Sequence, residues 1–326
     1  MRKLIYIMGC AHCGSTLLTT LLGRHSQIAT VGELKLTAVP DDPDYRCGCG
    51  ERLSECGFWK RVARACGERG EAFGFPDTRM HYSDGTRFGE RVVGTMIRGR
   101  GFEFLRTCGL RIWPTSRRLV RRLNRRSAVV VDAVCAVEGK KVFLDGSKDP
   151  TRLRHLVESG EFDVRPIYLV RDGRAITASY KKRNPNVAHC LGLWKSKAVE
   201  CESLVDYLGD DSILTLRYED LCRDVAGTLA AIFRFAGVTD ESEACLGPTA
   251  HASRHIIGHA SRLSHAKEVT LREEWRRLLT EEDLEDYWNV DDGLNPRHGY
   301  QRTEDPAGSV PVGADPAPVK QGNPVS

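Results

Sequence analysis

Residues 4–22 read LIYIMGCAHCGSTLLTTLL, and this stretch decides the fold class. The apolar run over residues 4–8 predicts a buried strand, and a glycine-containing loop follows it at once. Residues 15–22 are apolar enough for a helix, which Gly23 is placed to end. A strand, a tight loop and a helix in this order are typical of a parallel α/β sheet.

The rest of the chain repeats this alternation. Further strands are predicted near residues 28–31, 141–144, 165–170 and 212–217. Helices are predicted over residues 175–183, 224–236 and 280–288, the last from a capping-box-like TEED. We therefore expect a three-layer α/β domain over residues 1–302, with a parallel sheet between layers of helices. Residues 40–126 break the rhythm and are interpreted as a mainly helical insertion or cap. The Pro- and Gly-rich residues 303–326 are expected to be a disordered tail.

Composition and charge restrict the class of protein. The 326 residues are 41% hydrophobic and 28% charged, which suits a globular protein. A formal net charge of +4 fits a polyanionic cofactor or an acidic substrate, and is low for a nucleic-acid coat. The apolar run at residues 4–8 is shorter than the roughly 7–15 residues of a signal-peptide core, and no stretch approaches the roughly 20 residues of a membrane span. We expect a soluble, cytoplasmic protein without nucleic-acid partners, and mostly reduced cysteines.

The loop itself resembles a phosphate-binding P-loop, G-x-x-x-x-G-K-[ST]. Gly9, Gly14 and Thr16 have the right spacing, but Ser15 stands at the lysine position. Backbone N–H groups of such a loop and the start of the next helix form an anion site. Asp145 is the nearest candidate for a metal-binding aspartate, and it is not a convincing one. The loop therefore suits a smaller anion than a metal-bridged triphosphate. The alternative is a turn that binds no ligand.

A second candidate anion site lies at residues 168–179, YLVRDGRAITAS. Arg171 and Arg174 follow a predicted strand, and Ser179 lies on the helix after it. An arginine and a hydroxyl in this arrangement can bind one phosphate from two sides. The alternative is an arginine that pairs with Asp172. Two anion sites at the carboxyl ends of strands in one sheet favour a single ligand with two anionic groups.

These segments together resemble the sulfotransferases that use 3′-phosphoadenosine 5′-phosphosulfate (PAPS). GCAHCGSTLL at residues 9–18 is similar to the family's 5′-phosphosulfate loop, and LVRDGRAITAS at 169–179 is similar to its 3′-phosphate site. VGEL at 31–34, SKDP at 147–150 and RYEDL at 217–221 extend the resemblance. It implies a P-loop NTPase-like sulfotransferase fold, PAPS as donor and no metal requirement. The donor-binding residues that it implies are Cys13, Gly14, Ser15, Thr16, Leu17, Arg171, Ser179, Tyr218 and Arg262.

The resemblance also implies catalytic roles. Glu33 is the candidate general base, and Lys148 is the candidate that stabilises the transferring sulfuryl group. His12 is a further candidate for the task of Lys148. It stands where many members carry Arg or Lys, and Cys13 replaces the usual serine. The plainer alternatives are a solvated loop glutamate for Glu33 and a surface lysine for Lys148.

The insertion contains YRCGCGERLSECGFW at residues 45–59. Cys47, Cys49 and Cys56 would bind Zn²⁺ if Cys66 or a histidine completed four ligands. The spacing departs from C-x₂-C, so a local disulfide or reduced packing cysteines are alternatives, and the latter is favoured. Residues 98–126 hold ten arginines, including RRLVRRLNRR. They suit either a solvated helix face or a surface that attracts an acidic glycan or a membrane.

Three functions remain open from the sequence. The first is sulfuryl transfer from PAPS to a hydroxyl or amine of a small molecule, a glycan or a peptide tyrosine. The second is a P-loop kinase with a degenerate loop. The third is a sulfotransferase-like fold that binds a nucleotide without catalysis. The oligomeric state is not predicted.

Overall fold

The computed structural model describes residues 1–35, 44–75, 82, 93–94, 96–98, 100–247, 255–257 and 269–302. Within them lies one five-stranded sheet, of order β2-β3-β1-β4-β5, in which all pairs are parallel. Its strands are β1 (Arg2–Met8), β2 (Ile28–Thr30), β3 (Val142–Lys148), β4 (Phe162–Val170) and β5 (Leu214–Arg217). The predicted parallel α/β fold and all five predicted strands are confirmed. The predicted tail at 303–326 lies outside the described residues.

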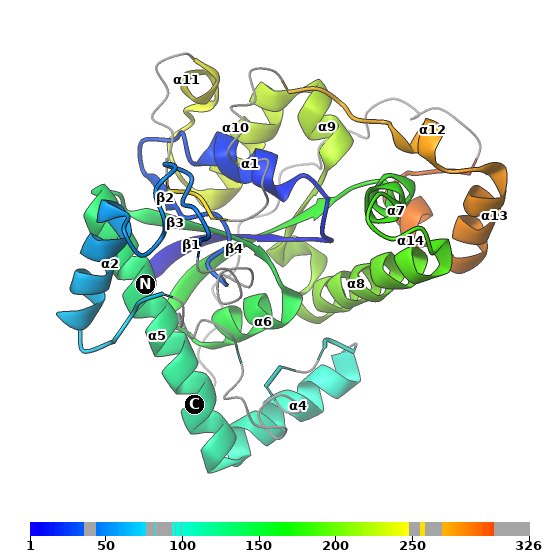
Figure 1. The fold of residues 1–326 in the computed structure, drawn as a ribbon. Coiled ribbons are helices and arrows are strands. Elements are labelled where there is room, and N and C mark those ends of the chain that lie inside the picture. The colour runs from blue at the N-terminus through cyan, green and yellow to red at the C-terminus, as the bar shows by residue number, and fades with distance from the viewer. Residues whose placement is uncertain are drawn as a thin grey trace.

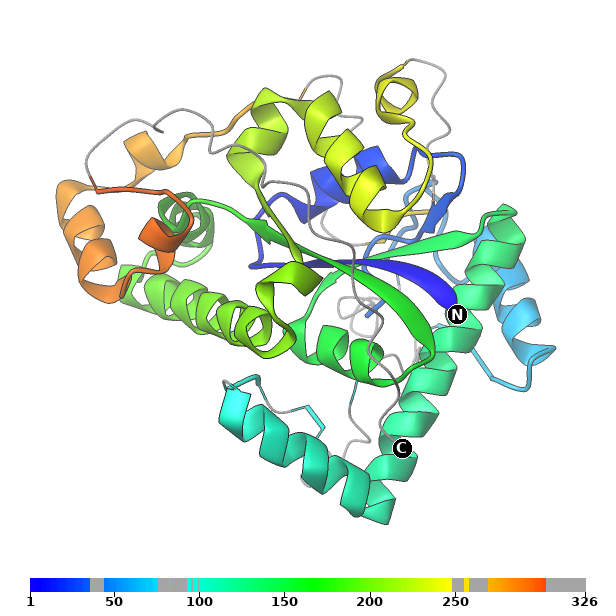
Figure 2. The same ribbon diagram turned by 180° about the vertical axis from the view of Figure 1, so that it is seen from behind.

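Helices cover both faces of the sheet (Figures 1 and 2). One face carries α1 (Ser15–Leu22), α9 (Tyr218–Arg223), α10 (Val225–Ala236) and α11 (Ser242–Leu246). The other carries α5 (Pro114–Glu138), α6 (Pro150–Glu158) and α8 (Val187–Leu208). Side chains of β1 alternate between the two cores: Ile5 packs with α1 and α10, while its neighbours Leu4 and Tyr6 pack with α5 and α6. Burial on both faces explains why β1 is apolar over its buried residues 4–8.

A group of shorter helices gathers beyond the carboxyl ends of the strands (Figure 1). It consists of α7 (Gly173–Lys181), α12 (Trp275–Leu278), α13 (Glu281–Val290) and α14 (Leu294–Arg297). In the sheet register Met8 lies opposite both Lys148 and Tyr168. The last residues of β1, β3 and β4 therefore reach the same edge of the sheet, and the loops that follow them start side by side.

The described part of the insertion is mainly helical, as expected. It contains α2 (Gly57–Gly67), α4 (Arg100–Ile112) and the start of α5, and Figure 1 shows α4 and this end of α5 extending away from the sheet. The expected boundary at residue 126 falls inside α5, because residues 128–131 and 133–134 continue the same helix and pack in the core under the sheet. No helix in the described ranges is both long and apolar enough to cross a membrane.

Candidate active site

A cleft of about 730 Å³ opens at the carboxyl edge of the sheet. It is lined by most of the residues that the sequence singled out, drawn from five separate segments. These are His12, Gly14, Ser15, Thr16, Leu17, Glu33, Lys148, Arg171, Ser179 and Tyr218. The two candidate anion sites and the two candidate catalytic side chains thus face one space.

The loop between β1 and α1 has the backbone of an anion-binding loop. His12 and Gly14 both have left-handed backbones, with φ values of 65° and 97°. A Cβ at position 14 would lie 2.4 Å from the ring of Tyr218, so both the backbone and the neighbouring ring require glycine. The first turn of α1 carries no acidic residue and no side-chain cap. Its positive end therefore faces the cleft without a carboxylate from its own first turn.

Arg171 connects the two candidate anion sites. Its Nη1 donates to the carbonyl oxygen of His12 at 2.8 Å, and its Nη2 donates to that of Arg272 at 2.9 Å. The guanidinium also stacks over the ring of Tyr218, 4.3 Å from its centroid. Ser179 lies two turns along α7, where its hydroxyl donates to the carbonyl oxygen of Ala175 at 2.8 Å. Arg171 is therefore held against the loop between β1 and α1 by contacts with backbone carbonyl oxygens.

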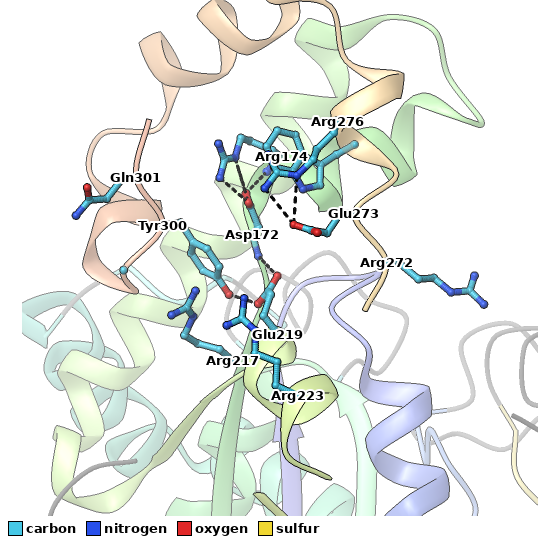
Figure 3. A pocket seen from close by; sticks show the side chains of 12 residues that line it. Asp172, Arg174, Arg217, Glu219, Arg223, Arg272, Glu273, Arg276, Tyr300 and Gln301 are labelled. Atoms are coloured by element: carbon cyan, nitrogen blue, oxygen red, sulfur yellow. Dashed lines mark hydrogen bonds and ion pairs between the residues drawn. The ribbon is translucent and has the colours of Figure 1, made fainter. Parts of the chain in front are cut away.

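Arg174 has a different role from Arg171. Figure 3 shows a small cavity next to the cleft, in which Arg174 pairs with Asp172 at 2.8 Å. The Arg174 guanidinium also stacks on Trp275, 4.1 Å from its ring centroid. The Asp172 amide donates to Glu219, which also accepts a hydrogen bond from the Tyr300 hydroxyl. The pairing that the sequence offered as an alternative for this segment exists, but it belongs to Arg174, which is buried and not part of the cleft lining.

Glu33 and Lys148 form an ion pair at the floor of the cleft. Lys148 Nζ lies 2.5 Å from Glu33 Oε1, and the two side chains are 17% and 23% exposed, respectively. Behind them the fully buried Asp145 accepts hydrogen bonds from the Leu34 amide and, at 3.0 Å, from Arg152 Nε. Asp145 therefore fixes the segment that bears Glu33 and is not available as a metal ligand in the cleft.

Two predicted donor-binding residues are not part of the described cleft lining. Cys13 is fully buried in the core between the sheet and α1, and burial raises the pKa of its thiol. A contact between its side chain and a ligand in the cleft is therefore not available. Arg262 lies outside the described residues. His12 packs edge-on against Tyr180, with 5.0 Å between the ring centroids.

Several further cleft residues were missed from the sequence. Lys182, Arg183 and Arg272 join Lys148 and Arg171, so among the described residues five Lys or Arg side chains and two glutamates line the cleft. The run YKKR at residues 180–183 could have indicated Lys182 and Arg183, because it follows Ser179 where α7 runs along the cleft. The excess of positive charge suits a ligand with more than one anionic group.

Comparisons with known proteins agree with this geometry. Residues 114–242 match the model of the sulfotransferase family. The chain is similar to the sulfotransferase domain from the Synechococcus PCC 7002 olefin synthase, with 20% identity and a TM-score of 0.51 over 91% of this chain and 94% of that one. It is also similar to the sulfotransferase domain from the curacin biosynthetic pathway, with 18% identity and a TM-score of 0.50 over 92% and 99% of the two chains. No match was found among curated proteins.

The predicted relationship to the sulfotransferases is therefore confirmed. The chain has the sulfotransferase fold, and its residues 114–242 match the family model. The matched segment contains Lys148, Arg171, Ser179 and Tyr218.

Proposed function

We propose that this protein transfers a sulfuryl group from PAPS to a hydroxyl or amine acceptor. The proposal is carried by one observation: Ser15, Arg171 and the Glu33–Lys148 pair line the same cleft of about 730 Å³. Ligand pockets commonly measure about 300–1,000 Å³, so this space suits a nucleotide with part of an acceptor.

The donor would be held from two sides. The amides of residues 14–17 and the hydroxyls of Ser15 and Thr16 would receive the 5′-phosphosulfate, with His12 beside them. Arg171 and Ser179 would receive the 3′-phosphate. Because a guanidinium has five N–H donors, the two carbonyl contacts of Arg171 leave donors for a phosphate. Tyr218 would pack near the nucleotide.

The proposed transfer needs only the donor, the acceptor and side chains that line the cleft. The acceptor oxygen or nitrogen attacks sulfur, and the bond from sulfur to the 5′-phosphate oxygen breaks, which releases adenosine 3′,5′-bisphosphate. Glu33 takes the acceptor proton, and Lys148 donates hydrogen bonds to the sulfuryl and leaving oxygens. The 2.5 Å contact between the two side chains supports this division of roles, because both would then reach one reacting group. No metal bridge is needed in this scheme.

The kinase alternative is less well supported. A P-loop kinase holds Mg²⁺ with a carboxylate beside the phosphates. Asp145, the residue closest to that role, is fully buried and already bound by Arg152 and by the amides of Leu34 and Ser147.

The test is a sulfate-radiolabelled PAPS assay over sugars, phenols, alcohols, amines and tyrosine peptides. We expect transfer to at least one class, and we expect Glu33→Gln to lower turnover by about 10²–10⁴-fold. Because a carboxylate offers no donor to a phosphate, the variant should keep its affinity for adenosine 3′,5′-bisphosphate. Full activity of Glu33→Gln would remove the base assignment. Absence of transfer, together with thermal stabilisation by ATP–Mg²⁺ alone, would favour the kinase.

A further inference from the structure

A cluster of metal-ligand side chains lies in the insertion, apart from the catalytic cleft. Cys47, Cys49 and Cys56 meet His255, which comes from a segment about 200 residues further along the chain. The three sulfur atoms and a ring nitrogen all lie within 4.8 Å of one another. The sequence indicated the three cysteines, and the fold supplies the histidine as a fourth ligand.

The separations of these atoms match the edges of a zinc tetrahedron. Zn–S bonds of about 2.3 Å and Zn–N bonds of about 2.0–2.1 Å require S···S edges of about 3.8 Å and S···N edges of about 3.5 Å in tetrahedral geometry. The sulfurs of Cys49 and Cys56 are 3.6 Å apart. His255 Nδ1 lies 3.4 Å from the Cys47 sulfur and 3.5 Å from that of Cys56. One ion at the centre could reach all four ligands without a large movement.

A disulfide does not explain the cluster. The twelve cysteines all lie in the described parts of the chain, and each is free. A disulfide needs a sulfur separation of about 2.05 Å, well below the 3.6 Å between Cys49 and Cys56. Cys66, which the sequence also offered as a ligand, lies outside the cluster. Its side chain is buried in the core beside α5, as expected for a cysteine that only packs.

Local backbone contacts hold the ligands in place. The Gly50 amide donates to the Cys47 carbonyl oxygen at 2.9 Å, which closes a tight turn that presents Cys47 and Cys49 together. Cys56 occupies the N-cap position of α2, so the start of this helix fixes its place in the cluster. The His255 ring stacks on Phe58, with 4.3 Å between centroids and an interplanar angle of 2°. This stack orients Nδ1 towards the sulfurs.

We propose that Cys47, Cys49, Cys56 and His255 bind one structural Zn²⁺ ion. Four protein ligands of the Cys₃His type form a closed site that leaves no position for a substrate, as is usual for structural zinc. The ion would join the insertion to the segment at residues 255–257.

That segment is in turn bound to the strand that leads to Glu33. The Ile257 amide donates to the Val31 carbonyl oxygen at 2.7 Å, and the Glu33 amide donates to the Ile257 carbonyl oxygen at 3.1 Å. The Gly48 amide donates to the Ile256 carbonyl oxygen at 3.2 Å. A bound zinc ion would therefore restrain the backbone at Glu33, the proposed base. This consequence rests on the proposed function, whereas the metal site itself does not.

The experiment measures zinc in the full chain, purified from zinc-supplemented cells without chelator, by inductively coupled plasma mass spectrometry. We expect about one Zn²⁺ per chain. Cys49→Ser and His255→Ala should each lower zinc content at least about tenfold after dialysis against a weak chelator. Cys49 is exposed, so its substitution leaves the core intact. Cys66→Ser is the matched control, because it changes a buried cysteine of α2 outside the cluster.

A second readout replaces zinc with Co²⁺. The wild type and Cys66→Ser should show the intense visible absorption of tetrahedral cobalt with thiolate ligands, and Cys49→Ser should not. Three results would overturn the proposal: a zinc-free wild type, equal metal loss from Cys66→Ser and Cys49→Ser, or a native Cys49–Cys56 disulfide in peptide mass spectra. Bound zinc without sulfuryl transfer on any acceptor would leave the metal site standing and count against the proposed function alone.

Discussion

Gly14→Ala is the substitution whose effect follows most directly from the geometry of the loop. Gly14 has φ 97°, a left-handed value that costs an L-residue about 1–2 kcal/mol. The new Cβ would lie 2.4 Å and 2.9 Å from two ring carbons of Tyr218. Displacing that ring adds about 1–3 kcal/mol of overpacking. We therefore expect the free energy of unfolding to fall by about 2–5 kcal/mol.

The assay is urea unfolding followed by circular dichroism, with Gly192→Ala as control. Gly192 lies on the exposed face of α8 with no atom within 4 Å of its added Cβ, so this variant should gain about 0.5–1 kcal/mol. The three atoms nearest to the added Cβ at Gly14 all belong to Tyr218. Adding Tyr218→Ala should therefore remove the overpacking part of the loss and leave the backbone part.

Gly14→Ala should also weaken adenosine 3′,5′-bisphosphate binding, because the displaced ring carries the stacked Arg171. Unchanged unfolding of Gly14→Ala would refute the loop conformation. Strictly additive effects of the two substitutions would refute the contact between Gly14 and Tyr218.

Lys148→Met should lower turnover by about 10²–10³-fold, because it removes a donor that acts on the reacting oxygens. The affinity for the bisphosphate should stay within a few-fold of the wild type. An unchanged kcat would contradict this role. His155 gives a pH prediction for stability: burial lowers its pKa to about 3, and its Nε2 lies 2.9 Å from the Val93 carbonyl oxygen. Below about pH 6.5, His155 is protonated in the unfolded chain but stays neutral in the folded chain. Its contribution therefore lowers the free energy of unfolding by up to about 1.4 kcal/mol per pH unit as the pH falls from about 6.5 towards 3. His155→Gln should flatten that part of the stability curve in urea titrations at several pH values, and an unchanged slope would contradict the prediction.

Local pattern was enough to predict the sheet and the loop. The strand at residues 4–8 and the helix at 15–22 are adjacent in sequence, so their periodicity and the intervening glycines define the unit without tertiary information. The carboxyl ends of β1, β3 and β4 then meet at one edge in any parallel sheet of this order. This rule is why Ser15, Lys148 and Arg171 could be expected to lie close together.

Packing decided what the sequence could not. Spacing alone does not separate Arg171 from Arg174 in the pattern RDGR, and the family resemblance selected Arg171. The structure shows the physical difference: Arg171 lines the cleft, whereas Arg174 is buried against Asp172 and Trp275. Cys13 stands in the binding motif, but its side chain points into the core. His255 was missed because a metal ligand about 200 residues from its partners leaves no local spacing to recognise.

The long helix α8 was also missed from the sequence. Its buried residues include Glu200 and Glu202 as well as Leu191 and Trp194, so its polar and apolar positions do not separate into two faces. Glu202 accepts hydrogen bonds from Arg297 and contacts His298, partners that lie far away in the sequence. Tertiary contacts of this kind override the periodicity on which helix prediction depends.

The central claim is that one adenosine-bearing molecule contacts both the loop at Ser15 and the guanidinium of Arg171. Calorimetric titration with adenosine 3′,5′-bisphosphate and with adenosine 5′-monophosphate tests this directly. We predict that the wild type binds the bisphosphate about 10–100-fold more tightly, and that Arg171→Ala removes this preference, because a charge-assisted contact contributes about 1.5–3 kcal/mol. Equal wild-type affinities for the two nucleotides, or a preference that survives in Arg171→Ala, would contradict the account.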